Sequence, residues 1–303
     1  MVNIPSSVKG YAVTAIGQEV FKECTFLTSI TIPPTVTKIG RDAFNGCIAL
    51  TSIVIPEGVT IIEDNTFNEC QSLTSVTIPN GVTSIGKWAF YSCTSLKTIT
   101  IPNSVKEIKM GAFRTCVSLK SLILPNSVTT IGERAFSGCS SLTSLSIPNS
   151  VTSMGRDAFT SCSSLTTVTT HITGIYAFSY CEKLASVTIL NNAAIVDKNA
   201  FSGCSSLVSI TLPNSVKIID SAAFRGCSSL KTITIPNGVT TINHYAFEDC
   251  HSLTSVTIPD SIISIGGYLF DDCTKLKTVY FKSEEQKEKF KHLFSADAQL
   301  IVQ

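Results

Sequence analysis

The sequence predicts an α/β solenoid, a coil of about twelve stacked repeats that share one core. Three observations carry this prediction. The twelve cysteines recur in one register, 23 residues apart except for a gap of 19 between Cys162 and Cys181. A Phe stands three residues before every Cys, and a Leu stands three residues after it. Nine of the repeats also have a Pro nine residues after the Cys, as at Pro79.

The first element of each repeat is predicted to be a short strand. In residues 72–96, Val76 and Ile78 alternate with Ser75 and Thr77, so the apolar pair points to one face and the hydroxyl pair to the other. Pro79 has no N–H group to donate to a neighbouring strand, so we expect the strand to end there.

A second short strand and a turn are predicted to complete the repeat. Val82 and Ile85 have the spacing of a second extended stretch with inward side chains. Gly86 predicts a tight turn with positive φ, because its counterparts are mostly Gly, Asp or Asn, as at Asp197, Asp220 and Asn243. The segment 87–93, KWAFYSC, is too short for a stable helix, so it predicts one helical or 3₁₀ turn with Phe90 and Cys93 facing inward.

One such repeat cannot bury its own apolar face, but stacked repeats can. We therefore expect each Phe to pack on the next Phe and each Leu on the next Leu. The repeats occupy residues 1–281, with an irregular short repeat near 163–181. Residues 282–303 are predicted to form a C-terminal cap: Ser283 and Gln286 have capping-box spacing, and Phe290, Leu293 and Phe294 share one helical face before the stretch AQLIV.

The repeat resembles the BspA-like class of leucine-rich repeats, whose units read C-x-x-L-x-x-I-x-I-P-x-x-V-x-x-I-G-x-x-A-F. The resemblance covers about Ile16 to Phe281. It implies a curved, right-handed superhelix with a concave parallel sheet and with the second strands and turns on the convex side. It also implies a surface that binds protein partners, with adhesion at a cell surface as the usual role, and it supplies no catalytic residue.

Composition excludes several classes of function. Charged residues make up 15% of the chain and the net charge is +1, so no strong field is predicted and nucleic acid is not an expected partner. No apolar run reaches the ~18 residues of a membrane span. The start, MVNIPSSVKGYAV, lacks a signal-peptide pattern, which allows a cytoplasmic protein, whereas the family resemblance favours the cell surface or secretion.

The twelve cysteines are predicted to form a ladder of buried free thiols. Each lies between an inward Phe and an inward Leu, and free Cys is among the most buried residue types. Neighbouring repeats ~4.8 Å apart would not rule out disulfides by distance alone, although parallel Cβ vectors stay longer than the ~3.8 Å that a disulfide favours. No Cys or His spacing indicates a metal, a cofactor or a catalytic centre, and His244, His251 and His292 are expected to be exposed loop residues.

Candidate partner-binding residues cluster at the turns beside the Phe column. Tyr245 and Tyr268 occupy equivalent places in successive repeats, and four acids stand beside them: Glu248, Asp249, Asp271 and Asp272. Such a surface suits an Arg/Lys-rich partner or a cation, and solvated turn residues are the alternative interpretation. In the short repeat, Tyr176 and Tyr180 flank the Phe and His171 precedes them. They indicate either a docking notch or a tolerated deletion.

The outward strand positions suggest a further alternative. Of the 24 positions, 21 are Ser or Thr, the exceptions being Val54, Ile123 and Tyr280. This regular array is suited to a soluble sheet, and it also fits a glycan or ice. We therefore predict a non-enzymatic, monomeric protein that binds protein partners, with an intracellular scaffold and a carbohydrate- or ice-binding array as the alternatives.

Overall fold

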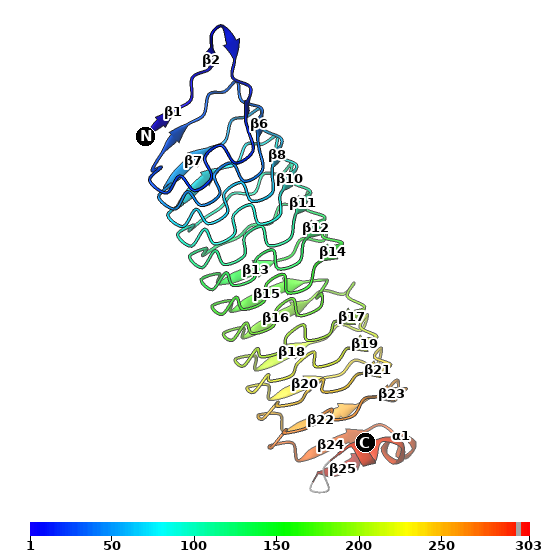
Figure 1. Cartoon of the computed structure of the whole chain (residues 1–303). Helices are drawn as coiled ribbons and strands as arrows, with labels where there is room; N and C mark the ends of the chain where they lie inside the picture. The colour runs from blue at the N-terminus through cyan, green and yellow to red at the C-terminus, as the bar shows by residue number, and fades with distance from the viewer. Residues whose placement is uncertain (295–297) are drawn as a thin grey trace. The chain divides into compact units, whose positions relative to one another are not determined.

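The computed structural model describes residues 1–294 and 298–303 and divides into two compact units, Met1–Cys162 and Ser163–Gln303. Each unit is a stack of coils, and each coil corresponds to one repeat (Figure 1). The boundary falls at the start of the short repeat. The predicted solenoid of parallel strands is therefore confirmed within each unit. The helical part of the predicted α/β class is not, because helix in the described residues is confined to 284–293, and the curvature and the handedness stay predictions.

The first strands of the repeats form one row in each unit, and two repeats of the first unit have only an isolated parallel bridge there, between Thr98 and Ser121. In the first unit the row contains β5 (Ile30–Thr31), β7 (Ser52–Val54), β9 (Ser75–Thr77) and β13 (Ser144–Ser146), and β7 pairs with β9 in parallel. In the second unit the strands run in parallel in the order β15 (Thr167–Thr170), β16 (Ser186–Ile189), β18 (Ser209–Thr211), β20 (Thr232–Thr234), β22 (Ser255–Ile258), β24 (Thr278–Phe281) and β25 (Gln299–Val302).

The predicted second row of strands is also present. In the first unit it contains β4 (Ala15–Ile16), β6 (Lys38–Ile39), β8 (Ile61–Ile62), β10 (Ser84–Ile85), β11 (Glu107–Ile108), β12 (Thr130–Ile131) and β14 (Ser153–Met154). In the second unit it contains β17 (Ile195–Val196), β19 (Ile218–Ile219), β21 (Thr241–Ile242) and β23 (Ser264–Ile265). Val82 and Ile85 are fully buried, as their spacing predicts.

The first coil is incomplete. Strand β1 (Val2–Asn3) pairs in parallel with β5, as a preceding repeat would. Strands β2 (Ser7–Val8) and β3 (Tyr11–Ala12) form an antiparallel hairpin, which Figure 1 shows at the N-terminal end of the first unit.

A column of stacked phenylalanine rings fills the core of each unit. Ring centroids of successive repeats lie 5.1–5.5 Å apart from Phe21 to Phe159. They lie 5.5–5.7 Å apart from Phe178 to Phe294. The predicted stacking of Phe on Phe is confirmed within each unit, and it explains why the same residue must recur at the same place in each coil.

The turn that carries each Phe differs from the prediction. Residues 87–93 form turns and not a helical or 3₁₀ segment, because alternate N–H groups bond to the next repeat: Trp88 N–H to Met110 O, Phe90 N–H to Ala112 O and Ser92 N–H to Arg114 O, at 2.9, 2.7 and 2.9 Å. A helix would need these donors for itself. The segment instead forms a third ladder between repeats.

The positive φ angles also lie elsewhere than predicted. Gly86, Asp197, Asp220 and Asn243 do not adopt positive φ. In all twelve repeats the left-handed residues stand five residues and one residue before the Cys, as at Trp88 (φ 57°) and Ser92 (φ 55°). Gly86 meets a different constraint, since a Cβ there would lie 2.6 Å from the backbone of Glu63 and Asp64 in the preceding coil.

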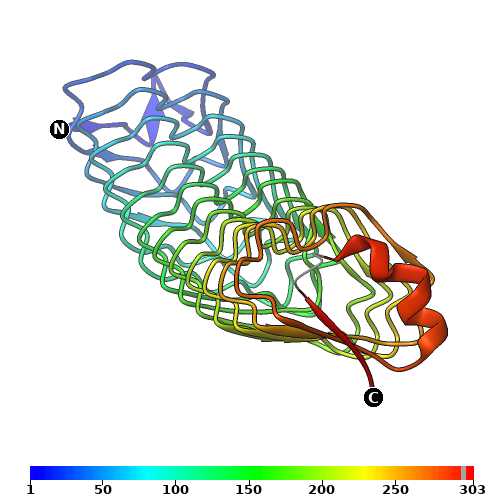
Figure 2. The same cartoon turned by 90° about the horizontal axis from the view of Figure 1, so that it is seen from below.

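The chain after β24 forms α1 (Glu284–Phe290) and the 3₁₀ helix η1 (Lys291–Leu293), followed by β25. The Ser283 side chain accepts a hydrogen bond from the Gln286 N–H group, which begins α1 at the predicted place. Figure 2 shows α1 and β25 beside the last coil of the second unit. None of the helical segments in residues 1–294 and 298–303 has the length and apolar content that a bilayer crossing needs.

Candidate functional site

The cysteines form a hydrogen-bonded ladder. The Cys116 thiol donates to the Phe90 carbonyl oxygen of the preceding repeat, with 3.2 Å between sulfur and oxygen, and that oxygen also accepts from the Cys93 N–H group at 3.3 Å. The same thiol bond recurs in both units, for example from Cys227 to Phe201. Each of these thiol bonds satisfies the second lone pair of a carbonyl group, which an alanine would leave unpaired.

Burial shields most of this ladder from reaction. All twelve cysteines are free thiols, and eleven are buried, Cys24 at the N-terminal end being the half-buried exception. Burial raises the pKa of Cys47 to about 11 and that of Cys116 to about 12. Since the thiolate is the nucleophile and the metal ligand, these groups are unsuited to either role near neutral pH. In the part of the chain that the structure describes, no three His, Cys, Asp or Glu side chains converge to suit a metal ion.

The hydroxyl array of the outward strand face is in register. Thr167 lies opposite Ser186, Ser209 opposite Thr232, and Ser255 opposite Thr278. Most of these side chains are exposed or half-buried. The exceptions Val54 and Ile123 are 67% and 81% exposed, so the face is not purely polar.

All candidate tyrosines lie on one face of the second unit, which we call the turn face. It is made of the residues five, two and one before each Cys: Tyr176, Ser179, Tyr180, Asn199, Ser202, Gly203, Ala222, Arg225, Gly226, Tyr245, Glu248, Asp249, Tyr268, Asp271 and Asp272. The four tyrosines occupy left-handed positions, with φ between 56° and 60°. The third ladder imposes this conformation in each repeat, so the φ angle itself does not mark a site.

Tyr245 and Tyr268 form a stacked pair next to the acidic residues. Their ring centroids lie 5.2 Å apart with 6° between the planes, and the side chains are 39% and 63% exposed. Stacking thus presents two ring systems as one exposed apolar surface. The sequence places the two residues in equivalent positions, and the structure confirms that they meet.

The acids beside this pair are only partly neutralised. Arg225 Nε lies 2.6 Å from Glu248 Oε2 and 3.6 Å from Asp249 Oδ2. Burial raises the pKa of Glu248; the Arg225 charge opposes this shift, and Asp249, Asp271 and Asp272 add to it. Among the residues that the structure describes, neither Asp271 nor Asp272 forms an ion pair, and both are exposed. The patch therefore carries net negative charge.

In the two repeats between the tyrosine pairs, the positions equivalent to the tyrosines have smaller side chains. Gly203 and Gly226 follow Tyr180 in one row, and Asn199 and Ala222 follow Tyr176 in the other. A Cβ on Gly203 would lie 2.7 Å from the Tyr180 ring, so this ring leans onto the bare backbone of the next coil. Tyr180 is 57% exposed, whereas Tyr176 and His171 are half-buried.

Asp197 holds the short repeat in place, a role that sequence reasoning missed. Its carboxylate accepts from the Thr173 hydroxyl at 2.6 Å and from the Gly174 N–H group at 2.9 Å. These bonds take the place of part of the strand pairing that the four missing residues would have supplied. Asp197 lies in the coil directly after the short repeat, and the sequence gives no signal of this contact, because the partners lie 23 and 24 residues away.

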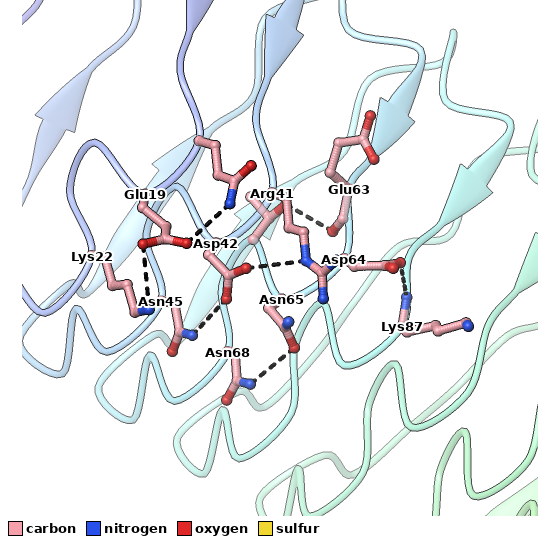
Figure 3. Close-up of polar contacts among 12 residues, drawn as sticks. Glu19, Lys22, Arg41, Asp42, Asn45, Glu63, Asp64, Asn65, Asn68 and Lys87 are labelled. Atoms are coloured by element: carbon pink, nitrogen blue, oxygen red, sulfur yellow. Dashed lines mark hydrogen bonds and ion pairs between the residues drawn. The ribbon is translucent and has the colours of Figure 1, made fainter.

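The equivalent turns of the first unit, five, two and one residues before each Cys, are organised differently. Their polar side chains pair with one another (Figure 3). Asn45 donates to Asp42 at 2.8 Å, and Asn68 donates to Asn65 at 3.2 Å. The single Trp, Trp88, lies edge-on to Tyr91 and under the Arg114 guanidinium.

The histidines do not form a cluster. His244, His251 and His292 are exposed, as predicted. His244 Nδ1 accepts from the Gly267 N–H group at 3.0 Å, and His251 Nδ1 lies 2.7 Å from the Asp272 carbonyl oxygen, so both stabilise adjacent turns.

Comparison with known proteins identifies the family. The family model described as BspA type leucine rich repeat region matches residues 2–120, 60–176, 106–204 and 170–292. Among curated proteins, none matches.

Three solved structures illustrate the similarity. A leucine-rich repeat protein from Bacteroides ovatus is 31% identical with a TM-score of 0.61, over 100% of this chain and 92% of that one. The T. pallidum leucine-rich repeat protein is 37% identical with a TM-score of 0.52, over 54% and 76%. The pneumococcal vaccine antigen PcpA, 20% identical with a TM-score of 0.55 over 100% and 88%, shares the fold. The chain belongs to the family of BspA-type leucine-rich repeat proteins.

Proposed function

We propose that this protein is a non-enzymatic binding protein whose turn face in the second unit engages a protein partner. One observation carries the proposal: two stacked, exposed tyrosine rings lie beside four carboxylates that share a single paired arginine. Aromatic side chains with low conformational freedom are typical anchors of protein interfaces. Tyr245 and Tyr268 have their geometry fixed before a partner arrives.

The charge of the patch specifies the partner. Arg225 is already used by Glu248 and Asp249, so Asp271 and Asp272 are available for a cation from outside. A guanidinium or ammonium group can contact a carboxylate and lie over a tyrosine ring at the same time, and cation–π contacts contribute ~0.5–1 kcal/mol at exposed sites. The partner is therefore a segment rich in Arg or Lys.

The surface extends towards the short repeat. Between Asp249 and Tyr180 lie the small residues of two coils, and three steps between coils span roughly 15 Å at ~4.8 Å each. An extended segment of about five residues covers that distance at ~3.3 Å per residue. Tyr176, Tyr180 and His171 form the second contact region of this proposal.

A peptide array tests the proposal. We expect 12-residue peptides rich in Arg and Lys to bind, and neutral or acidic peptides of equal length not to bind. The variants Tyr245→Ala/Tyr268→Ala and Asp271→Asn/Asp272→Asn should each weaken binding at least tenfold. Asn65→Ala, at the repeat position of Tyr245 in the first unit, is the matched control and should bind normally. Equal binding of acidic peptides, or unchanged binding by both double variants, would refute the proposal.

The setting that we propose is adhesion at a cell surface or in secreted form, which rests on the family to which the chain belongs. An intracellular scaffold is the alternative. Antibody labelling of intact cells of the native organism, compared with permeabilised cells, separates the two. Labelling only after permeabilisation would contradict the surface role.

We also propose that residues 1–281 are the repeat region and that residues 282–303 cap its end. Gln286 Nε2 donates to Asp260 O at 3.0 Å and to Ile262 O at 3.1 Å, and Phe294 continues the ring column after Phe270. These contacts cover carbonyl groups and an aromatic face that an open last coil would expose. A capped end favours a monomer, which sedimentation velocity can measure.

The in-register hydroxyl rows favour a second candidate, a glycan- or ice-binding array on the strand face. The rows are regular over β16, β18, β20 and β22, so they would suit a repetitive ligand. An ice-recrystallisation assay and a neutral glycan array test this candidate, and two negative results would remove it.

A further inference from the structure

The outward strand face of the second unit changes character at its C-terminal end. Tyr280 is the single aromatic residue among the 24 outward positions. It lies opposite Thr257 on β22 and opposite Ile301 on β25, and it is half-buried. The uniform hydroxyl rows therefore end in an aromatic ring flanked by a methyl-bearing and an aliphatic side chain.

Two lysines stand beside this ring. Lys275, Lys277 and Tyr280 line a shallow hollow of about 600 Å³, together with the hydroxyl residues Thr254, Ser255 and Thr278. Both lysines are exposed. Within the described residues neither lysine forms an ion pair, and no carboxylate lines the hollow. Their charges are thus available to a ligand.

The hollow combines three kinds of recognition. The flat ring of a tyrosine packs against the C–H face of a sugar ring, since one end of this side chain is apolar and the other polar. Ser and Thr hydroxyls both donate and accept hydrogen bonds, as sugar hydroxyls do. An ammonium group pairs with a carboxylate. A concave site with an apolar surface and a few convergent polar groups is the usual form of a small-ligand site.

The position of the hollow argues against addition of a peptide strand. Strand β22 is paired with β20 and β24, and β24 is paired with β22 and β25, so the backbone groups beneath the hollow already have partners. Recognition there depends on side chains that stand upright from the sheet. A peptide that binds by strand addition requires a free backbone edge, so side-chain hydroxyls beside an aromatic ring favour a saccharide here.

We propose that this hollow, the Tyr280 site, binds a carboxylated saccharide. The sugar ring lies on Tyr280, its hydroxyls contact Ser255 and Thr278, and its carboxylate pairs with Lys275 and Lys277. The site is on the strand face and uses no residue of the turn face. Its failure would leave the proposed binding of a cationic protein segment unaffected, and the reverse also holds.

Calorimetric titration with a galacturonate hexamer tests the assignment, with a maltose hexamer as the neutral probe. We expect the galacturonate hexamer to bind and its affinity to fall as salt rises. Tyr280→Ala and Lys275→Ala/Lys277→Ala should each weaken it at least tenfold, while Tyr280→Phe should stay within about twofold. Lys97 and Lys120 occupy the repeat position of Lys277 in the first unit, so Lys97→Ala/Lys120→Ala is the matched control.

Several results would overturn the assignment. Equal binding of the maltose hexamer would exclude the role of the carboxylate, and no binding of the galacturonate hexamer at millimolar concentration would exclude the site. A hexaglutamate peptide that binds as tightly as the saccharide would exclude a sugar. An equal loss in Lys97→Ala/Lys120→Ala would show a general charge effect. Unchanged melting temperatures of the variants confirm that each remains folded.

Discussion

Replacing Phe136 by Ala should destabilise the first unit severely. The side chain is fully buried, and its ring stacks on Phe113 at 5.2 Å and on Phe159 at 5.1 Å. Burial of a Phe side chain contributes ~1.5–3 kcal/mol, and each unfilled Å³ of the cavity that remains adds ~0.024 kcal/mol. The expected loss in the free energy of unfolding is about 3–5 kcal/mol.

The end of the column provides the matched comparison. Phe21 is half-buried and stacks only on Phe44, at 5.3 Å. Phe21→Ala removes one stacked neighbour and less buried area, so we expect a loss of about 1–2 kcal/mol. The difference between the two variants isolates the contribution of stacking within the array from the general cost of removing a phenylalanine.

Urea denaturation followed by Trp88 fluorescence measures both losses, because the single Trp lies in the same unit. A conservative variant, Phe136→Leu, should lie between the wild type and Phe136→Ala. A loss below ~1 kcal/mol for Phe136→Ala, or equal losses for Phe136→Ala and Phe21→Ala, would refute the view that each coil is stabilised by its neighbours.

Three further predictions concern single positions. A thiol reagent should label only Cys24 in the folded protein and all twelve cysteines in denaturant; rapid labelling of several thiols would contradict the buried ladder. Gly111→Ala should cost about 1–3 kcal/mol and shift the Trp fluorescence, because φ is 62° and a Cβ would lie 2.2 Å from the Trp88 ring. Gly81→Ala should be neutral, because a Cβ there would lie at an ordinary contact distance of 3.5 Å from its nearest neighbour, the Glu57 carbonyl oxygen. Because burial raises the pKa of Glu248 above its usual 4.5, the folded state holds this proton more tightly than the unfolded state, so its contribution to stability falls as pH rises from 4.5 through the raised pKa. Urea titrations between pH 4 and 7 should show this slope reduced in Glu248→Gln, and an unchanged slope would assign it to another group.

Periodicity made the core predictable. Val82, Ile85, Phe90 and Cys93 recur at fixed spacing, and each is fully buried. The conformation of the turns was not predictable in this way. The left-handed positions hold residues as different as Trp88, Arg134 and Tyr176, because hydrogen bonds to the next coil select the conformation and the side chain does not. The pattern of glycines in the sequence therefore predicts the turn conformation poorly, because the carbonyl group that binds each turn N–H lies 22 residues away.

The cysteine column shows a second limit of sequence reasoning. The recurrence of Cys predicted burial, but it gave no reason why the residue should be Cys and not Ala. The reason is the carbonyl group 26 residues earlier: the Cys139 thiol donates to Phe113 O at 3.3 Å, across one coil. Serine would supply a donor with a shorter reach and a larger desolvation cost, and alanine would supply none. Cys meets both requirements, burial and one hydrogen-bond donor, because its side chain is small and only weakly polar.

On the turn face, the backbone conformation and the identity of the side chains have different explanations. Every coil needs residues in the left-handed conformation there, and five of the 24 positions in the two rows hold Gly without loss of the ladder, as Gly203 and Gly226 illustrate. A tyrosine at such a position gains nothing from the backbone, since a left-handed L-residue costs ~1–2 kcal/mol relative to the right-handed form. Tyr245 and Tyr268 gain the stacking contact between their rings, and this stack presents an exposed face beside Asp271 and Asp272. The fold explains the conformation of these residues, and the partner that we propose would explain their identity.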